Sequence, residues 1–168
     1  MRSEQEANRA IGQYADTVRR ICMLHLKSYS DTEDIFQNVF LKYVLSSVEF
    51  TSEEHEKAWI IRVTINACKD LLKSFFHSKT VSYEQLLEEQ FHELQVRNTE
   101  MNEENKRVLE SVLTLPVKYK DVVYLYYYEE YTAVEIAKML GKNVNTVYTL
   151  LARAKELLRE KLGGDILA

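Results

Sequence analysis

Apolar residues recur every three or four positions along most of this chain, which is the spacing of one buried face of an α-helix. The pattern predicts an amphipathic helix over residues 4–28 and a second helix over residues 30–45. Ser30 and Glu33 have the spacing of a capping box, in which each side chain bonds a backbone N–H at the start of a helix. We therefore expect the second helix to begin at Ser30.

A third helix is predicted over residues 57–73, after a polar loop at residues 46–57 that is rich in Ser and Glu. This helix is apolar around most of its circumference, so it should lie between neighbours, with Trp59 as a core or half-buried anchor. Its one polar stripe consists of Arg62, Asn66, Lys69 and Lys73. Three cations and an amide on one face suit a surface that binds phosphates and contacts a base edge. An ordinary solvated face is the alternative.

The second helix has an unusual stripe opposite its apolar face. Acidic, amide and leucine side chains recur along it at helical spacing, at Asp34, Gln37, Asn38, Leu41 and Leu45. Leucines on a face that is otherwise polar suit a protein-binding surface. A stripe of ordinary surface residues is the alternative.

Two helices joined by a tight glycine turn are predicted between residues 132 and 162. Thr132 and Glu135 have capping-box spacing, and Gly141 suits the positive φ that follows a helix end. Asn143 can cap the next helix, whose first turns are then exposed. The segment has a surplus of about three positive charges. This outline favours a DNA-binding helix-turn-helix, and a helical hairpin that binds nothing is the alternative.

Composition favours an all-α protein, because 168 residues contain only four Gly and one Pro. The net charge is −4, and the acidity is concentrated in residues 80–105, which have seven acidic residues against Arg97 alone. This asymmetry predicts two domains joined by an acidic linker. Five neighbouring tyrosines between residues 124 and 131 are expected to divide between core and surface. No apolar run approaches the roughly 20 residues that span a bilayer, and no signal peptide is recognisable.

Metal-binding, redox and catalytic sites are not predicted. Cys22 and Cys68 are isolated in apolar helical surroundings, which is typical of buried free thiols. The four His residues lack ligand spacing to one another or to Cys. No Ser/His/Asp set, phosphate loop or carboxylate pair stands out, so we expect no catalytic residues, no metal and no cofactor.

Taken together, these segments resemble the extracytoplasmic-function (ECF) sigma factors, small promoter-recognition subunits of bacterial RNA polymerase. Asp31–Val44 resembles the region 2 helix that binds the polymerase clamp. Ala58–Lys73 resembles the helix that opens and contacts the −10 element, and Leu115–Ala154 resembles region 4, which contacts the −35 element. The order and spacing of these three motifs carry the resemblance over nearly the whole chain.

The resemblance implies an all-α fold with two small helical domains. A region 2-like domain at residues 1–75 would bind core polymerase and the −10 element. An acidic linker at residues 76–105 would thread the basic cleft of the polymerase. A region 4-like helix-turn-helix domain at residues 106–168 would bind the −35 element.

The resemblance also assigns contact residues. Those expected to contact core polymerase are Asp34, Gln37, Asn38 and Leu41. Those expected to face the −10 strand are Arg62, Asn66, Lys69 and Lys73. The loop at residues 46–56 would capture an unstacked base of the non-template strand. Those expected to contact the −35 duplex are Lys142, Asn143, Asn145, Thr146, Tyr148, Thr149 and Arg153.

The partners implied by the resemblance are core RNA polymerase, promoter DNA and an anti-sigma factor, which in this family is often membrane-anchored. The protein itself would be cytoplasmic, without membrane insertion and without a small-molecule substrate. Two alternatives stay open. One is a stand-alone helix-turn-helix regulator that binds DNA as a dimer. The other is a sigma-like protein-interaction module that has lost promoter binding.

Three features depart from the family pattern. Lys73 stands where Arg is common, which keeps the charge but loses bidentate geometry. Leu150 occupies a recognition-helix position where Arg is common, so weak or atypical −35 binding is expected. Acidic side chains in the loop before Trp59 should repel backbone phosphates; they are Glu49, Glu53, Glu54 and Glu56.

Overall fold

The computed structural model describes residues 1–26, 28–78 and 103–163, and every regular element in these ranges is helical. The predicted all-α class is therefore confirmed. The chain divides into two units, Met1–Leu94 and Gln95–Ala168. Most of the predicted acidic linker lies outside the described residues, so its boundaries stay a prediction.

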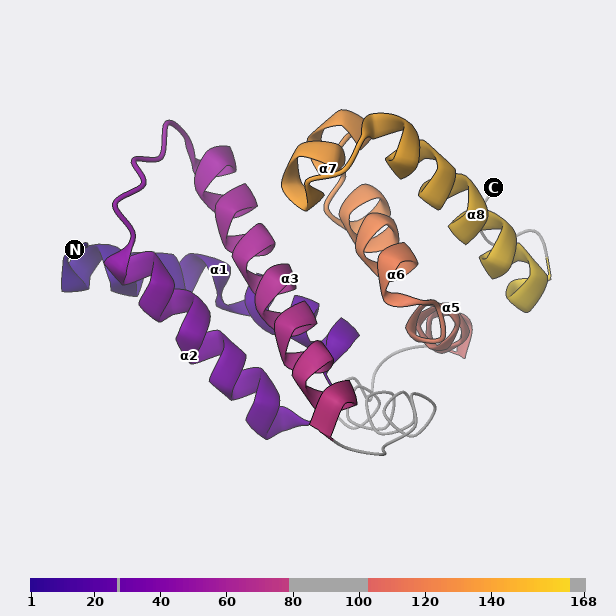
Figure 1. Ribbon diagram of the computed structural model, residues 1–168, viewed down its shortest axis with the longest axis horizontal. Helices are drawn as coiled ribbons and strands as arrows, with labels where there is room; N and C mark the ends of the chain where they lie inside the picture. Colours follow the sequence, from indigo (N-terminus) through magenta and orange to yellow (C-terminus); the bar gives the residue numbers. More distant parts are fainter. Residues whose placement is uncertain (27, 79–102, 164–168) are drawn as a thin grey trace. The chain divides into compact units, whose positions relative to one another are not determined.

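The N-terminal unit is built from α1 (Glu4–His25), α2 (Tyr29–Leu45) and α3 (Glu53–Ser78), and each of these helices packs against the other two (Figure 1). Apolar stripes from the three helices meet in one core. Its fully buried members include Ala10, Val18, Cys22, Val39, Ile60 and Cys68. Both cysteines are free and buried, as predicted, and their Sγ atoms lie 3.9 Å apart.

Helix boundaries in this unit differ from the sequence prediction at three points. The first helix ends at His25 rather than at residue 28. The second begins at Tyr29, and its cap is Ser28, whose Oγ accepts a bond from the Asp31 N–H at 3.0 Å. The predicted cap at Ser30 is wrong because Ser30 already lies in the first helical turn. The third helix begins at Glu53, so the loop before it is shorter than predicted.

The C-terminal unit contains α5 (Glu103–Leu113), α6 (Val117–Val123), α7 (Ala133–Leu140) and α8 (Val144–Leu162). The long helix α8 packs against the other three (Figure 1). Its core includes Leu113, Leu115, Val122, Leu125, Ile136, Val147, Ala154 and Leu158. Buried faces from every described helix of this unit therefore converge on one side of α8, and its other side is left to solvent.

The helix α6 continues into η1 (Tyr124–Tyr128), a single π-helical turn. In this wider turn the Glu129 N–H donates to the Tyr124 carbonyl at 3.1 Å, and the Tyr124 hydroxyl donates to the Glu129 carboxylate at 2.7 Å. Tyr124 is buried, whereas Tyr126, Tyr127 and Tyr128 are exposed. The tyrosines thus divide between core and surface, as predicted.

Candidate functional site

The outer face of α2 presents all four residues predicted to contact core polymerase. Asp34, Gln37 and Asn38 are exposed, and Leu41 exposes 56% of its surface. Leu45 continues the same stripe one turn later and is 61% exposed. The opposite face of the helix is buried in the core through Ile35, Val39, Phe40 and Tyr43. The stripe is therefore a continuous polar-and-leucine surface that the described part of the unit leaves uncovered.

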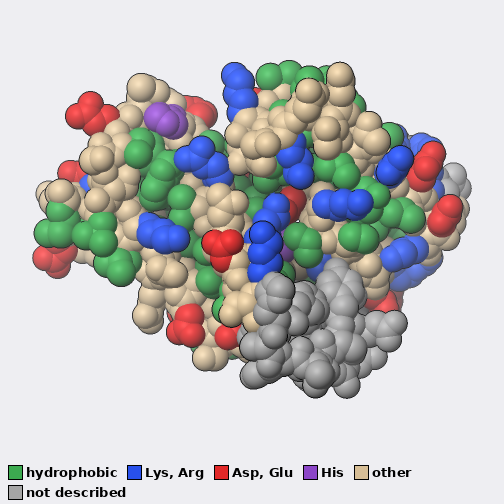
Figure 2. Space-filling model, in the orientation of Figure 1, with side chains coloured by type: hydrophobic (Ala, Val, Ile, Leu, Met, Phe, Trp, Pro, Cys, Tyr) green, Lys and Arg blue, Asp and Glu red, His purple; other side chains and the backbone are tan. Residues whose placement is uncertain are grey.

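The outer face of α3 presents the residues predicted to face the −10 strand. Arg62, Asn66 and Lys73 are exposed, and Lys69 is half-buried. The buried side of the same helix consists of Ile60, Ile61, Thr64, Ile65 and Cys68. Because this apolar side is held in the core, the four polar side chains share one face of a fixed helix. Figure 2 shows Lys and Arg side chains over α3, with hydrophobic, neutral and acidic side chains among them.

The loop between α2 and α3 is anchored by an aromatic cluster. The ring of Phe50 stacks against Tyr43, with centroids 6.1 Å apart, and meets the edge of Trp59 at 5.7 Å. Trp59 is half-buried and also contacts the Tyr43 ring at 6.2 Å. Trp59 is thus a half-buried anchor, as predicted, and it supports the loop that precedes the cationic face of α3.

Glu56 does not belong to the acidic loop surface that the sequence suggested. Only 5% of its surface is exposed, and its carboxylate points into the three-helix unit. It accepts bonds from Arg9 Nη2 at 2.7 Å, Tyr43 OH at 2.8 Å and Tyr14 OH at 2.9 Å. The expectation that Glu56 repels DNA phosphates is therefore wrong, because its charge is turned inward and neutralised by Arg9. Glu49, Glu53 and Glu54 remain exposed.

The pKa values of this cluster follow from its geometry. Burial by itself would raise the pKa of the Glu56 carboxyl, but the hydrogen bonds from Arg9, Tyr43 and Tyr14 outweigh burial. The pKa of Glu56 therefore lies below its ordinary value of 4.5. Burial and the bond to the same carboxylate raise the pKa of Tyr14 and of Tyr43 above their ordinary values. In this cluster the ionised carboxylate of Glu56 is paired with the ionised guanidinium of Arg9, and the phenols of Tyr14 and Tyr43 are neutral.

The helix-turn-helix forms as the sequence predicts. Thr132 Oγ1 accepts from the Glu135 N–H at 3.2 Å, and Glu135 Oε1 accepts from the Thr132 N–H at 3.0 Å, which completes the capping box. Gly141 ends α7 with φ 65° and ψ 38°. The Asn143 side chain caps α8 by accepting from the Asn145 N–H at 2.8 Å. These local bonds fix where α8 begins and which of its faces is exposed.

The start of α8 exposes most of the residues predicted to contact the −35 duplex. Exposed members are Asn143, Asn145, Thr146, Tyr148, Thr149 and Arg153, and Lys142 is half-buried. Tyr148 exposes 57% of its surface. Figure 2 shows Lys and Arg side chains over α8 as well. A polar, partly cationic face at the N-terminal end of an exposed helix is the arrangement that enters a major groove.

Leu150 belongs to the core and not to this exposed face. It is 8% exposed and lies on the side of α8 that carries Val147, Ala154 and Leu158. The expectation that position 150 corresponds to a DNA-contacting arginine is therefore wrong in this protein, because the side chain at this position points into the unit. Leu150 therefore gives no reason to expect weak or atypical binding to the −35 element.

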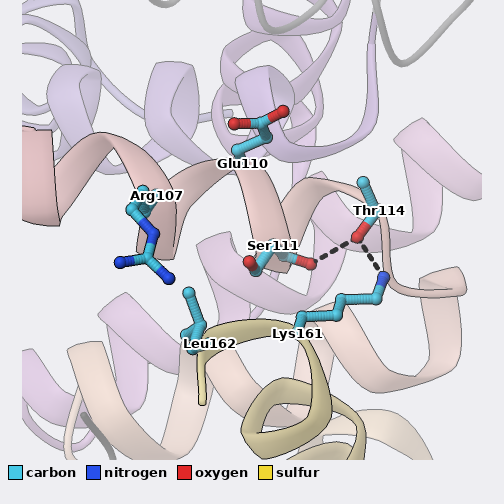
Figure 3. A pocket seen from close by; sticks show the side chains of 6 residues that line it. All are labelled: Arg107, Glu110, Ser111, Thr114, Lys161 and Leu162. Atoms are coloured by element: carbon cyan, nitrogen blue, oxygen red, sulfur yellow. Dashed lines mark hydrogen bonds between the residues drawn. The ribbon is translucent and has the colours of Figure 1, made fainter.

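A shallow cavity of about 310 Å³ lies between α5 and the end of α8, away from these faces (Figure 3). It is lined by Arg107, Glu110, Ser111, Thr114, Lys161 and Leu162. The Lys161 ammonium donates to Thr114 Oγ1, which in turn donates to the Ser111 carbonyl at 2.7 Å. None of the predicted contact residues lines this cavity. It is a feature of the packing between α5 and α8.

In residues 1–26, 28–78 and 103–163, no group of three or more His, Cys, Asp or Glu side chains is arranged to hold a metal ion. No helix in the same ranges combines the length and hydrophobicity needed to cross a membrane.

Sequence reasoning missed two arginines that organise the N-terminal unit. Arg9 bonds Glu56, 47 positions away, and Arg2 bonds the backbone of the loop between α2 and α3. Neither residue belongs to a local motif, and both contacts depend on how distant helices pack. No signal in the sequence alone points to either pair.

Comparison with known proteins relates the two units to one family. The family model described as Sigma-70 region 2 matches residues 10–74, and the one described as Sigma-70, region 4 matches residues 105–158. The ECF RNA polymerase sigma factor SigW of Bacillus subtilis is 25% identical over 166 residues, covering 89% of this chain and 84% of the relative. The RNA polymerase sigma factor SigV of the same organism is 29% identical over 144 residues, covering 85% and 82%.

Solved structures share the fold. The sigma factor RpoE in complex with the anti-sigma factor NepR from Bartonella quintana gives a TM-score of 0.67 at 15% identity, over 96% of this chain and 99% of that one. CnrH in complex with the cytosolic domain of CnrY gives 0.62 at 14% identity, over 96% and 90%. With both sigma regions in order along the sequence and with relatives that span most of it, the chain belongs to the ECF sigma factors.

Proposed function

We propose that this ECF sigma factor binds core RNA polymerase through the outer face of α2 and contacts promoter DNA with α3 and α8. The observation that carries the proposal is the stripe on α2. Leu41 and Leu45 are more than half exposed and follow Asp34, Gln37 and Asn38 along the same face of the helix. The opposite face is buried in the core. Exposed leucines beside polar side chains are typical of a surface that a partner covers.

The −10 element is assigned to α3 and to the loop before it. Arg62, Lys69 and Lys73 supply charge for phosphates, and Asn66 supplies an amide that can bond a base edge. The loop at residues 46–52 supplies backbone and side-chain groups for a base that leaves the stack. Unstacking a base costs a few kcal/mol, which contacts in the polymerase complex must offset.

The −35 element is assigned to the exposed start of α8. Asn145, Thr146 and Thr149 can contact base edges, whereas Lys142 and Arg153 can hold the backbone on either side. The charge surplus of this segment is small, so binding should depend on the polymerase for much of its affinity. This dependence on the polymerase favours a sigma subunit over a stand-alone regulator.

The remaining assignments follow from the family. The protein acts in the cytoplasm as a binding subunit, without catalysis or cofactor of its own, and promoter melting takes place in the complex with polymerase. An anti-sigma factor is a further partner, as in the structure of RpoE with the anti-sigma factor NepR. The domain boundaries at residues 75 and 106 are part of the proposal, with the acidic segment between them as linker.

Co-elution of the purified protein with bacterial core RNA polymerase tests the proposal. We expect the wild type to co-elute, and Asp34→Arg and Leu41→Arg to lose binding by at least tenfold, because each places a charge in the contact surface. Asp16→Arg is the matched control, since Asp16 is an exposed acid on α1 outside the stripe. Circular dichroism confirms that all variants are folded.

Two outcomes would contradict the proposal. If the wild type does not bind core polymerase but shifts a specific DNA duplex by itself, the protein is a stand-alone regulator. If it binds polymerase but the complex does not protect promoter DNA, it is an interaction module without promoter binding.

A further inference from the structure

The loop between α2 and α3 is bonded to the beginning of the chain. The Arg2 N–H donates to the Val44 carbonyl at 2.9 Å, at the end of α2. The Arg2 guanidinium donates from Nη1 to the Ser46 carbonyl at 3.0 Å, and from Nη2 to the Val48 carbonyl. One residue from the N-terminal end thus bonds three backbone carbonyls over five consecutive positions.

The same guanidinium contacts the aromatic cluster beneath the loop. Its Cζ atom lies 4.7 Å from the centroid of the Tyr43 ring and 4.9 Å from that of Phe50. Both distances lie within the range of a cation–π contact. Because Phe50 is itself part of the loop and Tyr43 is part of α2, Arg2 joins the loop to the helix through its side chain as well as through the backbone.

One bond within the loop and one to the first turn of α3 complete this arrangement. The Val48 N–H donates to Ser46 Oγ at 3.1 Å, and the Thr51 N–H donates to His55 Nδ1 at 3.1 Å. The His55 ring also meets the edge of Phe50 at 5.2 Å. Side-chain and ring contacts therefore hold the backbone of the loop, whereas Ser47, Val48 and Glu49 remain exposed.

We propose that Arg2 is a positioning residue that presets the loop at residues 46–50 for capture of an unpaired promoter base. The inference rests on the proposed function of this loop. A loop that is already ordered does not have to be ordered when the base binds, so the base is held more tightly for the same contacts. Arg2 acts through the loop conformation and needs no contact with DNA.

Two measurements on the full-length protein test the role of Arg2. The first is hydrogen exchange of peptides covering residues 46–52 in the free protein. The second is binding of the complex with core polymerase to a fork-junction DNA, compared with the same DNA carrying an abasic site at the captured position. The variants are Arg2→Met, which removes the charge and the donors, and Arg2→Lys, which keeps the charge but cannot bond two carbonyls as a fork does.

Arg19→Met is the matched control. Arg19 is also an arginine of the N-terminal unit that lies over an aromatic ring, with its Cζ atom 4.3 Å from the Phe36 centroid. It bonds Glu33 on α2 at 3.3 Å, and both of these contacts lie on α2 away from the loop. Its replacement removes a similar set of interactions elsewhere in the same unit.

We expect Arg2→Met to speed exchange in the loop and to reduce the preference for the intact base over the abasic site by about tenfold. Arg2→Lys should fall between Arg2→Met and the wild type in both measurements. Arg19→Met should change neither, and affinity for core polymerase should be the same in all four proteins.

Different outcomes overturn the inference and the function on which it rests. If exchange in the loop is the same in Arg2→Met as in the wild type, Arg2 does not position the loop. If exchange increases but the preference for the intact base is unchanged, the preset conformation does not serve base capture. If the wild-type complex itself does not distinguish the intact base from the abasic site, the assignment of base capture to this loop fails, whatever Arg2 does.

Discussion

The Glu56 carboxylate accepts a bond from Arg9 Nη2 at 2.7 Å and a second one from Arg9 Nη1 at 3.0 Å, which joins the start of α3 to α1. The hydroxyl of Tyr43, on α2, donates to the same carboxylate. All three helices of the N-terminal unit therefore meet at one buried charge. Because Glu56 lies just before Trp59 and the cationic face of α3, this cluster sets where that face begins.

Removing the Glu56 charge should weaken the N-terminal unit. We expect Glu56→Gln and Arg9→Met each to reduce the free energy of unfolding by roughly 1–3 kcal/mol. Arg9→Met leaves the buried Glu56 carboxylate with fewer bonds, and Glu56→Gln replaces the charged acceptor of Arg9, Tyr14 and Tyr43 by a neutral one. In the double variant the two losses should be less than additive, with a coupling of about 1 kcal/mol or more. Urea denaturation followed by Trp59 fluorescence measures all three, and Glu54→Gln, an exposed neighbour, is the control. Additive losses would mean that the pair does not act as a unit.

The same carboxylate predicts how the unit responds to acid. The pKa of Glu56 is lower in the folded protein than its ordinary value of 4.5, so the folded state binds fewer protons than the unfolded state. The contribution of Glu56 is therefore present in full above about pH 4.5, and it is lost as the pH falls through the lower folded pKa. Urea midpoints measured from pH 7 to pH 3 should fall more steeply for the wild type than for Glu56→Gln. Parallel curves would contradict the lowered pKa.

Leu150 offers a direct test of the corrected assignment on α8. Because Leu150 is buried, Leu150→Arg should destabilise the C-terminal unit by roughly 2–4 kcal/mol and should not improve binding to a −35 duplex. Ala152→Arg adds the same side chain at an exposed position of the same helix and should leave stability unchanged. Calorimetry and duplex binding of the polymerase complex distinguish the two. A gain in −35 binding by a stable Leu150→Arg protein would show that position 150 faces DNA.

These residues show what the sequence could and could not predict. The capping box of Thr132 and Glu135 and the turn at Gly141 depend on bonds within a few residues, so local spacing was enough. The α2 and α3 stripes followed from helical periodicity. The spacing of Leu150 to Val147 and Ala154 places it on the buried face by the same rule, whereas the family resemblance aligns it with a DNA-contacting arginine.

Long-range contacts lay beyond such rules. The bonding partners of Glu56 are 13, 42 and 47 positions away in sequence, and no periodic pattern joins them. A glutamate in a Ser- and Glu-rich stretch therefore looked like a solvated loop residue. Its burial depends on how α1 and α2 pack against the start of α3. The choice between Ser28 and Ser30 as a cap was likewise ambiguous, because both serines precede an acidic residue by three positions.

Two glycines should respond in opposite ways to the same substitution. Gly141 has φ +65° and Gly12 lies inside α1, and an added Cβ would meet no atom within 4 Å at either position. Gly141→Ala should therefore cost about 1 kcal/mol through backbone strain alone. Gly12→Ala should gain about 0.5–1 kcal/mol, because alanine loses less backbone entropy in a helix. Thermal unfolding of both variants measures this, and a stabilising Gly141→Ala would contradict the left-handed turn.

Lys120 is a buried base whose replacement should stabilise the C-terminal unit. Only 1% of its surface is exposed, and burial lowers its pKa to about 8, although Asp121 nearby partly opposes this. The unfolded state then binds more protons between about pH 8 and the ordinary value of 10.5, so stability should rise with pH across that window. At pH 7 the full cost is present, and Lys120→Met should gain up to roughly 3 kcal/mol.

Calorimetry at pH 7, 8.5 and 10 tests this for the wild type, Lys120→Met and the exposed control Lys138→Met. The gain from Lys120→Met should shrink as the pH rises, because the wild-type lysine loses its proton and with it the cost of burying a charge. Lys138→Met should show no such trend. A gain that is constant with pH would mean that the benefit comes from packing of the methionine, and a loss would mean that the bonds of the charged lysine outweigh its burial.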